Sequence, residues 1–228
     1  MANTKITAHV YEPLWINFMR QSNALFLKRD AFLNHVVSSE VRHLASDLDE
    51  KRLSAKAKRY ISGKLKSMGS HRARPVNIVV QQECAKSLNE IVARSNLVRD
   101  SFINRLFFLL RASDSFLDYF GFPLKVDPAS EGAESVPMSP LKALEALRDD
   151  PLHYLRTSAK QRFDCGLYTL PFPEPLHGFS CYLDENQIPE TPAFARKKAD
   201  YDKILASLEP LEKAAFSQTN PKPQGSDK

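Results

Sequence analysis

Apolar and polar residues alternate over a short stretch that begins near residue 74. Val76, Ile78 and Val80 stand at every second position, which is the period of a β-strand with one buried face. Branched residues of this kind also favour extended structure. From about Gln82 the apolar residues recur every three or four positions instead, as on the buried face of a helix: Cys84, Ala85, Leu88, Ile91 and Val92. The pattern predicts a strand followed directly by a helix of about three turns.

A second helix is predicted after a short break. The sequence Arg94-Ser95-Asn96 interrupts the helical period, and asparagine tolerates the left-handed conformation that ends many helices. Helical spacing resumes from about Arg99, with Phe102, Ile103, Leu106, Phe107, Leu109 and Leu110 on the inner side. Residues 74–113 are therefore predicted to form a strand, a helix, a turn and a second helix.

The same order of elements recurs 70 residues earlier in the chain. The segments Lys28–Asn34 and Val98–Asn104 share the pattern Arg-Asp-x-Phe-x-Asn. The same offset predicts a strand over Lys5–Tyr11. Agreement is poorer in the helix that follows, where Gln21 and Ser22 fall on apolar positions and an offset of 73 would fit better. We interpret residues 1–45 as a degenerate first copy of the unit, with a chance match of short segments as the alternative.

A basic helix is predicted between the two copies, in a linker that covers residues 46–73. The helix is expected over Leu48–Leu65, and its cations could lie along a phosphate backbone or simply face solvent. They are Lys51, Arg52, Lys56, Lys58, Arg59 and Lys64, with Lys66 just beyond.

Residues 114–216 are predicted to form a separate, acidic and mostly helical domain. Short helices are expected at Pro140–Arg148 and Pro151–Ser158, and a longer one from about Ala193. The three alternating prolines of Pro171–Pro175 favour an extended surface connector. The polar residues 217–228 are predicted to be a disordered tail.

Charge divides the chain at the same place. The net charge is +5, but residues 1–113 hold 19 Lys or Arg against 9 Asp or Glu, whereas residues 114–228 hold 13 against 18. A basic half of this kind suggests that it binds a polyanion, most often nucleic acid.

Several classes of protein are excluded or disfavoured by composition. The longest apolar run, Leu106–Leu110, is far short of the ~18–20 residues of a membrane helix, and the first residues lack the apolar stretch of a signal peptide. Three cysteines without a Cys-x-x-Cys pair fit a reducing cytosol. No glycine-rich phosphate loop is present. Six scattered histidines have no partners at metal-ligand spacing. We therefore expect a cytoplasmic protein without cofactor, metal or catalytic activity.

The strand–helix–helix pattern resembles the ribbon-helix-helix family of DNA-binding proteins, the group of Arc and MetJ. The tandem copies are similar to proteins of the TraY type, and the additional acidic region to plasmid-borne regulators of conjugation genes of the AcaB type. The resemblance implies a fold that is mainly α with a short two-stranded antiparallel β-ribbon, plus a helical C-terminal domain. One departure is that Lys28 and Val98 stand where the family commonly has a Ser or Thr cap for the second helix, which leaves Asp100 as the candidate cap.

The resemblance also implies which residues bind double-stranded DNA. Side chains on the outer face of the ribbon would contact base edges in the major groove: Asn77 and Val79, flanked by Arg74 and Gln81, and in the first copy Lys5, Thr7 and His9. Near the starts of the second helices, Lys28, Arg29 and Arg99 would contact phosphates, unless the arginines pair with neighbouring acids. In the linker the candidate phosphate contacts are Lys58, Arg59, Lys64 and Lys66.

The expected function is a sequence-specific transcriptional regulator, with conjugation genes of a plasmid or mobile element as targets if the architectural similarity extends so far. The alternatives are a relaxosome accessory protein that bends DNA, and an antitoxin whose C-terminal region binds a toxin. A homodimer or higher oligomer is expected, and the C-terminal domain is a candidate site for a protein partner. The sequence leaves open whether the ribbon pairs within one chain or between two.

Overall fold

The structure is a computed structural model that describes residues 2–69, 73–122 and 148–189, and statements about structure refer to these residues. Met1–Leu183 form one compact unit, and Asp184–Lys228 form a second one. In the second unit the described residues contain one short 3-10 turn, η2 (Glu185–Gln187), which is capped by Asp184. The following paragraphs concern the first unit.

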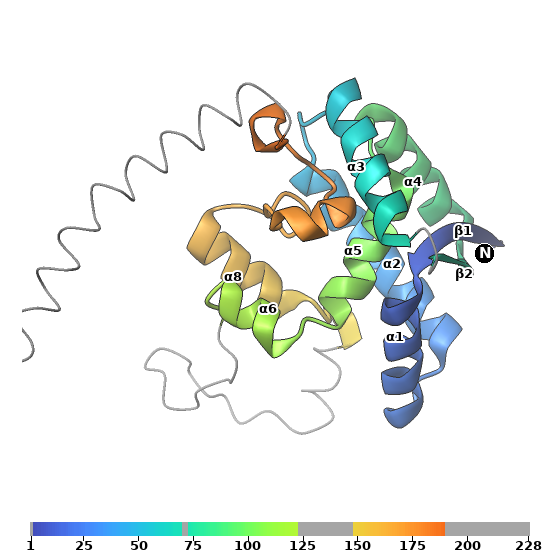
Figure 1. The fold of residues 1–228 in the computed structure, drawn as a ribbon. Coiled ribbons are helices and arrows are strands. Elements are labelled where there is room, and N and C mark those ends of the chain that lie inside the picture. Colours follow the sequence, from blue (N-terminus) through green and yellow to red (C-terminus); the bar gives the residue numbers. More distant parts are fainter. Residues whose placement is uncertain (1, 70–72, 123–147, 190–228) are drawn as a thin grey trace, which may run out of the picture. The chain divides into compact units, whose positions relative to one another are not determined.

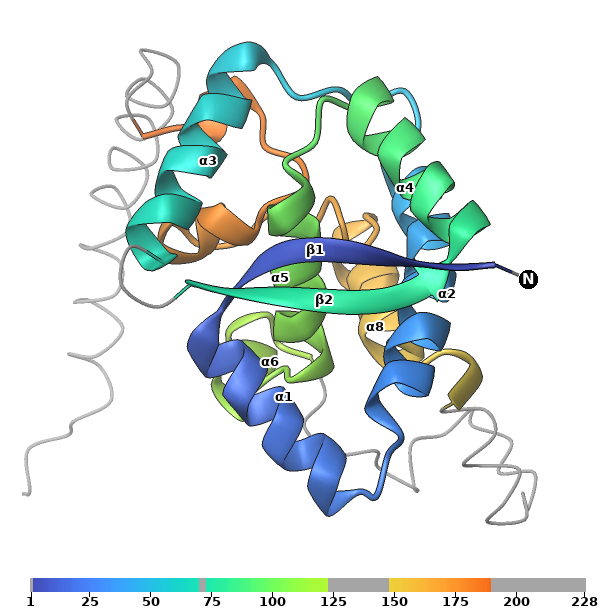
Figure 2. The same ribbon diagram turned by 90° about the vertical axis from the view of Figure 1, so that its right-hand side faces the viewer.

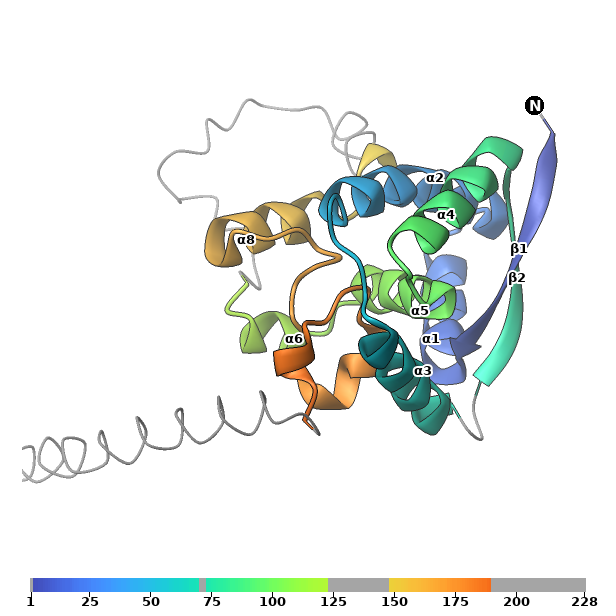
Figure 3. The same ribbon diagram turned by 90° about the horizontal axis from the view of Figure 1, so that it is seen from above.

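Two strands of the same chain form an antiparallel ribbon. β1 (Asn3–Tyr11) pairs with β2 (Ala73–Gln81) along its whole length. Helices lie on one side of this ribbon, and no described element covers its other side, as the edge-on view of Figure 3 shows. The predicted fold class, mainly α with a two-stranded antiparallel ribbon, is confirmed. The pairing that the sequence left open takes place within one chain.

The repeat extends through all of its helices without insertions. α1 (Glu12–Ala24) and α2 (Arg29–Asp47) begin 70 residues before α4 (Gln82–Arg94) and α5 (Arg99–Leu110), respectively (Figure 1). Phe26 and Asn96, which are also 70 residues apart, both have a positive φ in the turn between the helices. The alternative offset of 73 residues is not needed. The 70-residue offset places Ser22 at an apolar position of the repeat, and Ser22 is indeed buried in α1 despite its polarity.

The two repeats are related by an approximate two-fold axis through the centre of the ribbon. Thr7 and Asn77 are equivalent under the 70-residue offset, and they face each other across the strands. The second helix of each repeat packs on the strand of the other repeat, and the shared asparagine of the repeated motif makes the junction. The Tyr11 amide donates to Asn104 Oδ1 at 2.8 Å, and the Gln81 amide donates to Asn34 Oδ1 at 3.2 Å. The repeats are thus interlocked.

The linker helix begins later than predicted. α3 covers Ala55–Gly69, whereas residues 48–54 form a loop in which Leu48 and Leu53 are buried. The helix starts where Ser54 Oγ accepts a hydrogen bond from the Ala57 amide at 3.1 Å, which is the usual role of a capping serine. The segment is therefore an integral part of the core and not a free connector.

The boundary predicted at residue 114 does not separate two cores. After α6 (Asp114–Tyr119), the chain forms α8 (His153–Phe163) and the 3-10 helix η1 (Glu174–Phe179). Phe116, Leu167 and Phe179 belong to the same hydrophobic cluster as the inner residues of α5. The structure places the division after Leu183 instead, because the apolar face of α5 is larger than the two repeats alone can cover.

The proline-rich segment also differs from its prediction as a surface connector. Phe172, between two of the prolines, is buried, and η1 begins at Glu174 with Pro175 in its first turn. Proline is tolerated there because the first amides of a helix have no partner inside it. The predicted helix at Pro140–Arg148, apart from Arg148 itself, the helix from Ala193 and the tail lie outside the described residues.

Candidate nucleic-acid interface

The bare side of the ribbon is the candidate interface, and we call it the outer face. In Figure 2 the strands cross in front of α5, with the helices behind them. Alternation buries one row of side chains, which consists of Ile6, Ala8 and Val10 with Val76, Ile78 and Val80. The other row is exposed at Lys5, Thr7, His9 and Asn77 and partly exposed at Val79 and Gln81. Six of the seven predicted base-contacting residues therefore belong to one row.

The centre of the outer face is polar and held in place. Thr7 Oγ1 donates a hydrogen bond to Asn77 Oδ1 at 2.8 Å. The Thr7 carbonyl accepts from Arg99 at 3.0 Å, which ties the strand to the start of α5. Because Thr7 bonds to Oδ1, no described residue uses the two donors of the Asn77 amide nitrogen, and both can serve a ligand.

Arg74 is the predicted base-contacting residue that does not belong to the outer row. Its position shares the inner side of β2 with Val76, and it is exposed because it stands near the end of the strand, opposite Val10. Strand alternation, which places residues an even number apart on one side, could have shown this from the sequence. Gln81 is in the outer row, at the last position of β2, where its backbone amide donates a hydrogen bond to the Asn34 side chain.

The second helices of both repeats begin without a side-chain cap. Neither the Lys28 side chain before α2 nor the Val98 side chain before α5 accepts a hydrogen bond from the first turn. Asp100, the candidate cap, instead lies 3.3 Å from His9 Nδ1 on the ribbon. Among the described residues no side chain caps the start of either helix, and a phosphate is suited to that position.

The two arginines at these helix starts have different partners. Arg29 Nε donates to Asp30 at 2.7 Å, as the alternative interpretation expected, and this hydrogen bond lowers the pKa of Asp30. Arg99 instead donates to the Thr7 carbonyl. Lys28, next to Arg29, is exposed.

Two of the four predicted phosphate contacts of the linker are engaged inside the protein. Lys58 Nζ donates to Asn96 Oδ1 at 2.9 Å, and Lys64 Nζ pairs with Glu174 at 2.7 Å. Arg59 and Lys66 are exposed and form no ion pair with the described residues. Helix spacing could not predict that Lys58 and Lys64 have partners and that Arg59 and Lys66 are exposed. The acceptors Asn96 and Glu174 are distant in the sequence.

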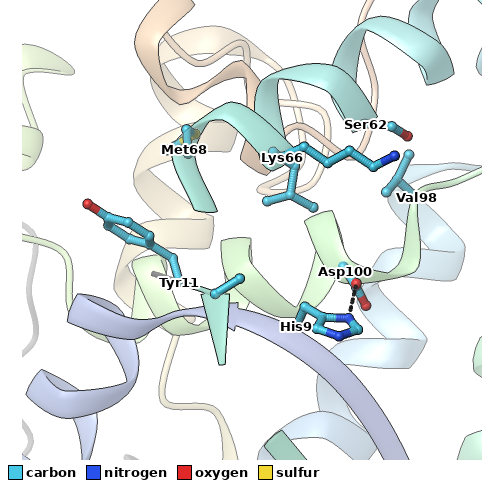
Figure 4. Close-up of a pocket in the computed structure, with 9 residues that line it drawn as sticks. His9, Tyr11, Ser62, Lys66, Met68, Val98 and Asp100 are labelled. Atoms are coloured by element: carbon cyan, nitrogen blue, oxygen red, sulfur yellow. Dashed lines mark hydrogen bonds and ion pairs between the residues drawn. The ribbon is translucent and has the colours of Figure 1, made fainter. Parts of the chain in front are cut away.

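A pocket of about 480 Å³ lies at one end of the ribbon, between β1, α3 and the start of α5. In Figure 4, Lys66 extends along one side of it, and the His9–Asp100 pair lies opposite. The rest of its wall is largely apolar and was not identified from the sequence: Tyr11, Leu65, Met68, Ala73 and Val98, together with Ser62. The pocket places Lys66 beside the outer face, close to the uncapped start of α5.

A second cluster of ionisable residues lies away from the ribbon. Atoms of Glu40, His43 and Asp150 that could ligate a metal lie within 4.8 Å of one another. Glu40, however, is buried and accepts hydrogen bonds from Arg156 at 2.8 Å and Tyr168 at 2.7 Å. The guanidinium already supplies the positive charge that this carboxylate needs, so the cluster is an internal ion-pair network.

The cysteines are in environments that disfavour the thiolate. Burial raises the pKa of Cys181 to about 12, and burial also raises the pKa values of Cys84 and Cys165. A cysteine nucleophile requires the opposite shift.

Comparisons with protein-family models, with curated proteins and with solved structures found no match. Among the described residues, no helix has the length and apolar character needed to cross a membrane.

Proposed function

We propose that this protein binds double-stranded DNA sequence-specifically by inserting the β1–β2 ribbon into the major groove. The observation that carries the proposal is the outer face itself, a polar row centred on Thr7 and Asn77 with helices on the opposite side only. A two-stranded ribbon fits the ~12 Å width of the major groove, and its outward side chains then meet base edges. Two interlocked strand–helix–helix repeats are the arrangement expected of the ribbon-helix-helix family, here with both strands supplied by one chain.

The helix starts support the same proposal. The uncapped first turns of α2 and α5 are equivalent in the repeat and stand at positions related by the approximate two-fold axis. A ribbon in the groove is flanked by two phosphate backbones, and each would meet one helix start. Lys28 and Lys66 add exposed cations near these starts.

The outer face predicts an operator with unlike halves. Residues equivalent in the repeat differ, since Lys5 corresponds to Pro75 and His9 to Val79. In the observed register Lys5 lies opposite Val79, whereas His9 lies opposite Pro75. One half of the ribbon therefore offers an amine and an apolar side chain, and the other half offers an imidazole and a proline. Because one chain supplies two different strands, its ribbon can fit a DNA site whose two halves differ. A symmetric dimer of identical chains has identical halves and would fit such a site less closely.

The biological role that we propose is regulation of transcription. Footprinting over the genome and its plasmids separates this role from that of a relaxosome accessory protein, since promoters and a transfer origin are different places. The spacing of bound sites also gives the number of ribbons at each site.

The ribbon's role is tested with Asn77→Ala and a selection from random duplex DNA. Asn77 is at the centre of the outer face, and a good bidentate base contact is worth about 1–3 kcal/mol of discrimination. We expect the variant to lose preference at one or two adjacent base pairs while keeping its affinity for unrelated DNA. Asn23→Ala, an exposed asparagine at the end of α1, is the matched control and should select the wild-type site.

An unchanged consensus for Asn77→Ala, or an equal loss of affinity for every duplex, would show that the ribbon does not read the sequence.

A further inference from the structure

The pocket at the end of the ribbon has the size and the lining of a small-molecule site. Its volume of about 480 Å³ falls within the roughly 300–1,000 Å³ of pockets that hold small ligands. Such pockets are mainly apolar, and a few polar groups fix the orientation of the ligand. Here the polar side chains are those of His9, Ser62, Lys66 and Asp100, and their charges determine which ligand can bind.

The polar side chains gather towards one end of the pocket. In Figure 4 the Lys66 ammonium lies towards the same end as Ser62 and Asp100. Tyr11 and Met68 lie at the opposite end. A thioether and an aromatic ring both pack well against a large apolar group. A ligand that fills the pocket therefore needs a polar head and a large apolar body.

The polar end carries two opposite charges that do not pair with each other. Lys66 is exposed and forms no ion pair with the described residues, although Asp100 lines the same pocket. The Asp100 side chain is only 26% exposed, and its Oδ2 lies 3.3 Å from His9 Nδ1. Its Oδ1 has no hydrogen-bond partner within the described part of the chain. An ammonium and a carboxylate that face one pocket without pairing leave space for a molecule that carries both charges.

A ligand with a single charge suits this end less well. A carboxylate alone would pair with Lys66 but would also face the Asp100 carboxylate. An amine alone would pair with Asp100 but would face the Lys66 ammonium. Repulsion between like charges is stronger in a partly buried site than in water, so a zwitterion is the head group that both side chains favour.

We propose that this pocket binds an α-amino acid with a large apolar side chain. The carboxylate of the amino acid pairs with Lys66, and the hydroxyl of Ser62 is a further donor to it. The ammonium of the amino acid pairs with Asp100 Oδ1. The side chain extends along the apolar wall towards Tyr11 and Met68.

The experiment is isothermal titration calorimetry of the full chain, without DNA, with L-tryptophan, L-phenylalanine and L-leucine. At least one of them should bind with one molecule per chain. The amino acid that binds most tightly is then compared with its amine and acid analogues, which for tryptophan are tryptamine and indole-3-propionate. Each analogue should bind about tenfold more weakly, because it lacks one charge-assisted hydrogen bond. Glycine, which has both charges but no apolar body, should not bind measurably.

Two variants assign these charges to their partners in the protein. Lys66→Met keeps an apolar stem and should weaken the amino acid about tenfold without weakening the amine analogue. Asp100→Asn should weaken the amino acid to a similar extent without weakening the acid analogue. Lys86→Met, at an exposed lysine of α4, is the matched control and should bind as the wild type does. Thermal melts show whether each variant is folded, and the analogues test the proposal on the wild-type protein in any case.

Three results would overturn the proposal: no binding of any of the three amino acids at millimolar concentration, an analogue with one charge that binds as tightly as its parent, or unchanged affinity in both the Lys66 and the Asp100 variants. Because no DNA is present, each result is independent of whether the ribbon binds DNA.

Discussion

His177 is a buried residue whose ionisation is coupled to folding. It lies in η1, and its Nδ1 is 3.1 Å from the Tyr60 hydroxyl on α3. Burial lowers the pKa of His177, and a backbone hydrogen bond to Phe172 opposes the shift only in part. The neutral ring is thus the form that joins η1 to α3.

Stability should accordingly fall as the pH is lowered through the ordinary histidine pKa near 6.5. The folded pKa is depressed, so between it and the ordinary value near 6.5 the unfolded chain binds more protons than the folded one. The free energy of unfolding should drop by on the order of 1 kcal/mol per unit of pKa difference, as urea titrations at each pH would measure. His177→Gln should reduce this pH dependence.

The matched control is His35→Gln, because His35 is exposed on α2. It should leave the slope of stability against pH as in the wild type. A His177→Gln variant with the full wild-type slope would assign the effect to other groups.

At the scale of elements, α3 has two roles on two sides. Lys64 and Tyr60 contact η1, whereas Lys66 lines the pocket beside the ribbon. The two lysines are only two residues apart, which makes them a natural pair for comparison.

Lys66→Gln should flatten the salt dependence of DNA binding, and Lys64→Gln should not. Each phosphate contact adds about 0.9 to the slope of log K against log salt, so the first variant should lose roughly one unit. The Lys64 pKa is raised mainly by its hydrogen bond to Glu174, and its removal should alter the packing of η1 and not the slope. Fluorescence anisotropy over a salt series measures both.

Equal slopes for the wild type and Lys66→Gln would place the end of α3 away from the DNA backbone. If both variants reduced the salt slope equally, the effect would come from the general loss of positive charge and not from a specific phosphate contact.

At the level of the complete fold, the two repeats depend on the segment that follows them. Arg105, in the middle of α5, is fully buried. Its guanidinium donates to the carbonyls of Leu167 at 2.8 Å and Leu170 at 2.7 Å and lies 3.8 Å from the centroid of the Phe172 ring. Without residues 167–172 this cation would lack its acceptors, and a buried charge without partners costs several kcal/mol.

A chain that ends at residue 113 should therefore not fold cooperatively, although it contains both repeats. Phe102 would also lose its contact with Tyr168, and Phe108 its contacts with Phe172 and Phe179, which would add to the loss. Near-ultraviolet circular dichroism and thermal melts test this, with a chain ending at residue 189 as the control that should keep a sharp transition. A shortened chain of 113 residues that melts sharply and binds DNA would show that the repeats are an independent domain.

Local periodicity predicted most of the elements. Both strands, α4, α5 and the 70-residue repeat follow from the spacing of apolar residues, because side-chain periods of two and of three to four reflect backbone geometry alone. The outer row of the ribbon follows from the same alternation. Fold class could therefore be predicted from residues near one another in the sequence.

The candidate site was predictable only in part. Lys58, Lys64 and Arg99 are cations on predicted surfaces, yet each donates a hydrogen bond to a residue far away in the sequence. Helix spacing shows which side chains share a face, but it cannot show which acceptors are folded against that face.

The class of the fold, its internal repeat and the division of charge between the two halves of the chain follow from the amino-acid sequence alone. The partner of each surface depends on the three-dimensional structure. It joined β1 to β2 within one chain, placed Asn34 and Asn104 at the strand ends of opposite repeats, and buried Arg105 against the C-terminal segment. It also covered Ser95–Leu97, whereas within the described part of the chain Leu25–Leu27 remain exposed. These outcomes depend on contacts between distant residues, whose free energies come from burial and from the satisfaction of buried polar groups, and no local period encodes them.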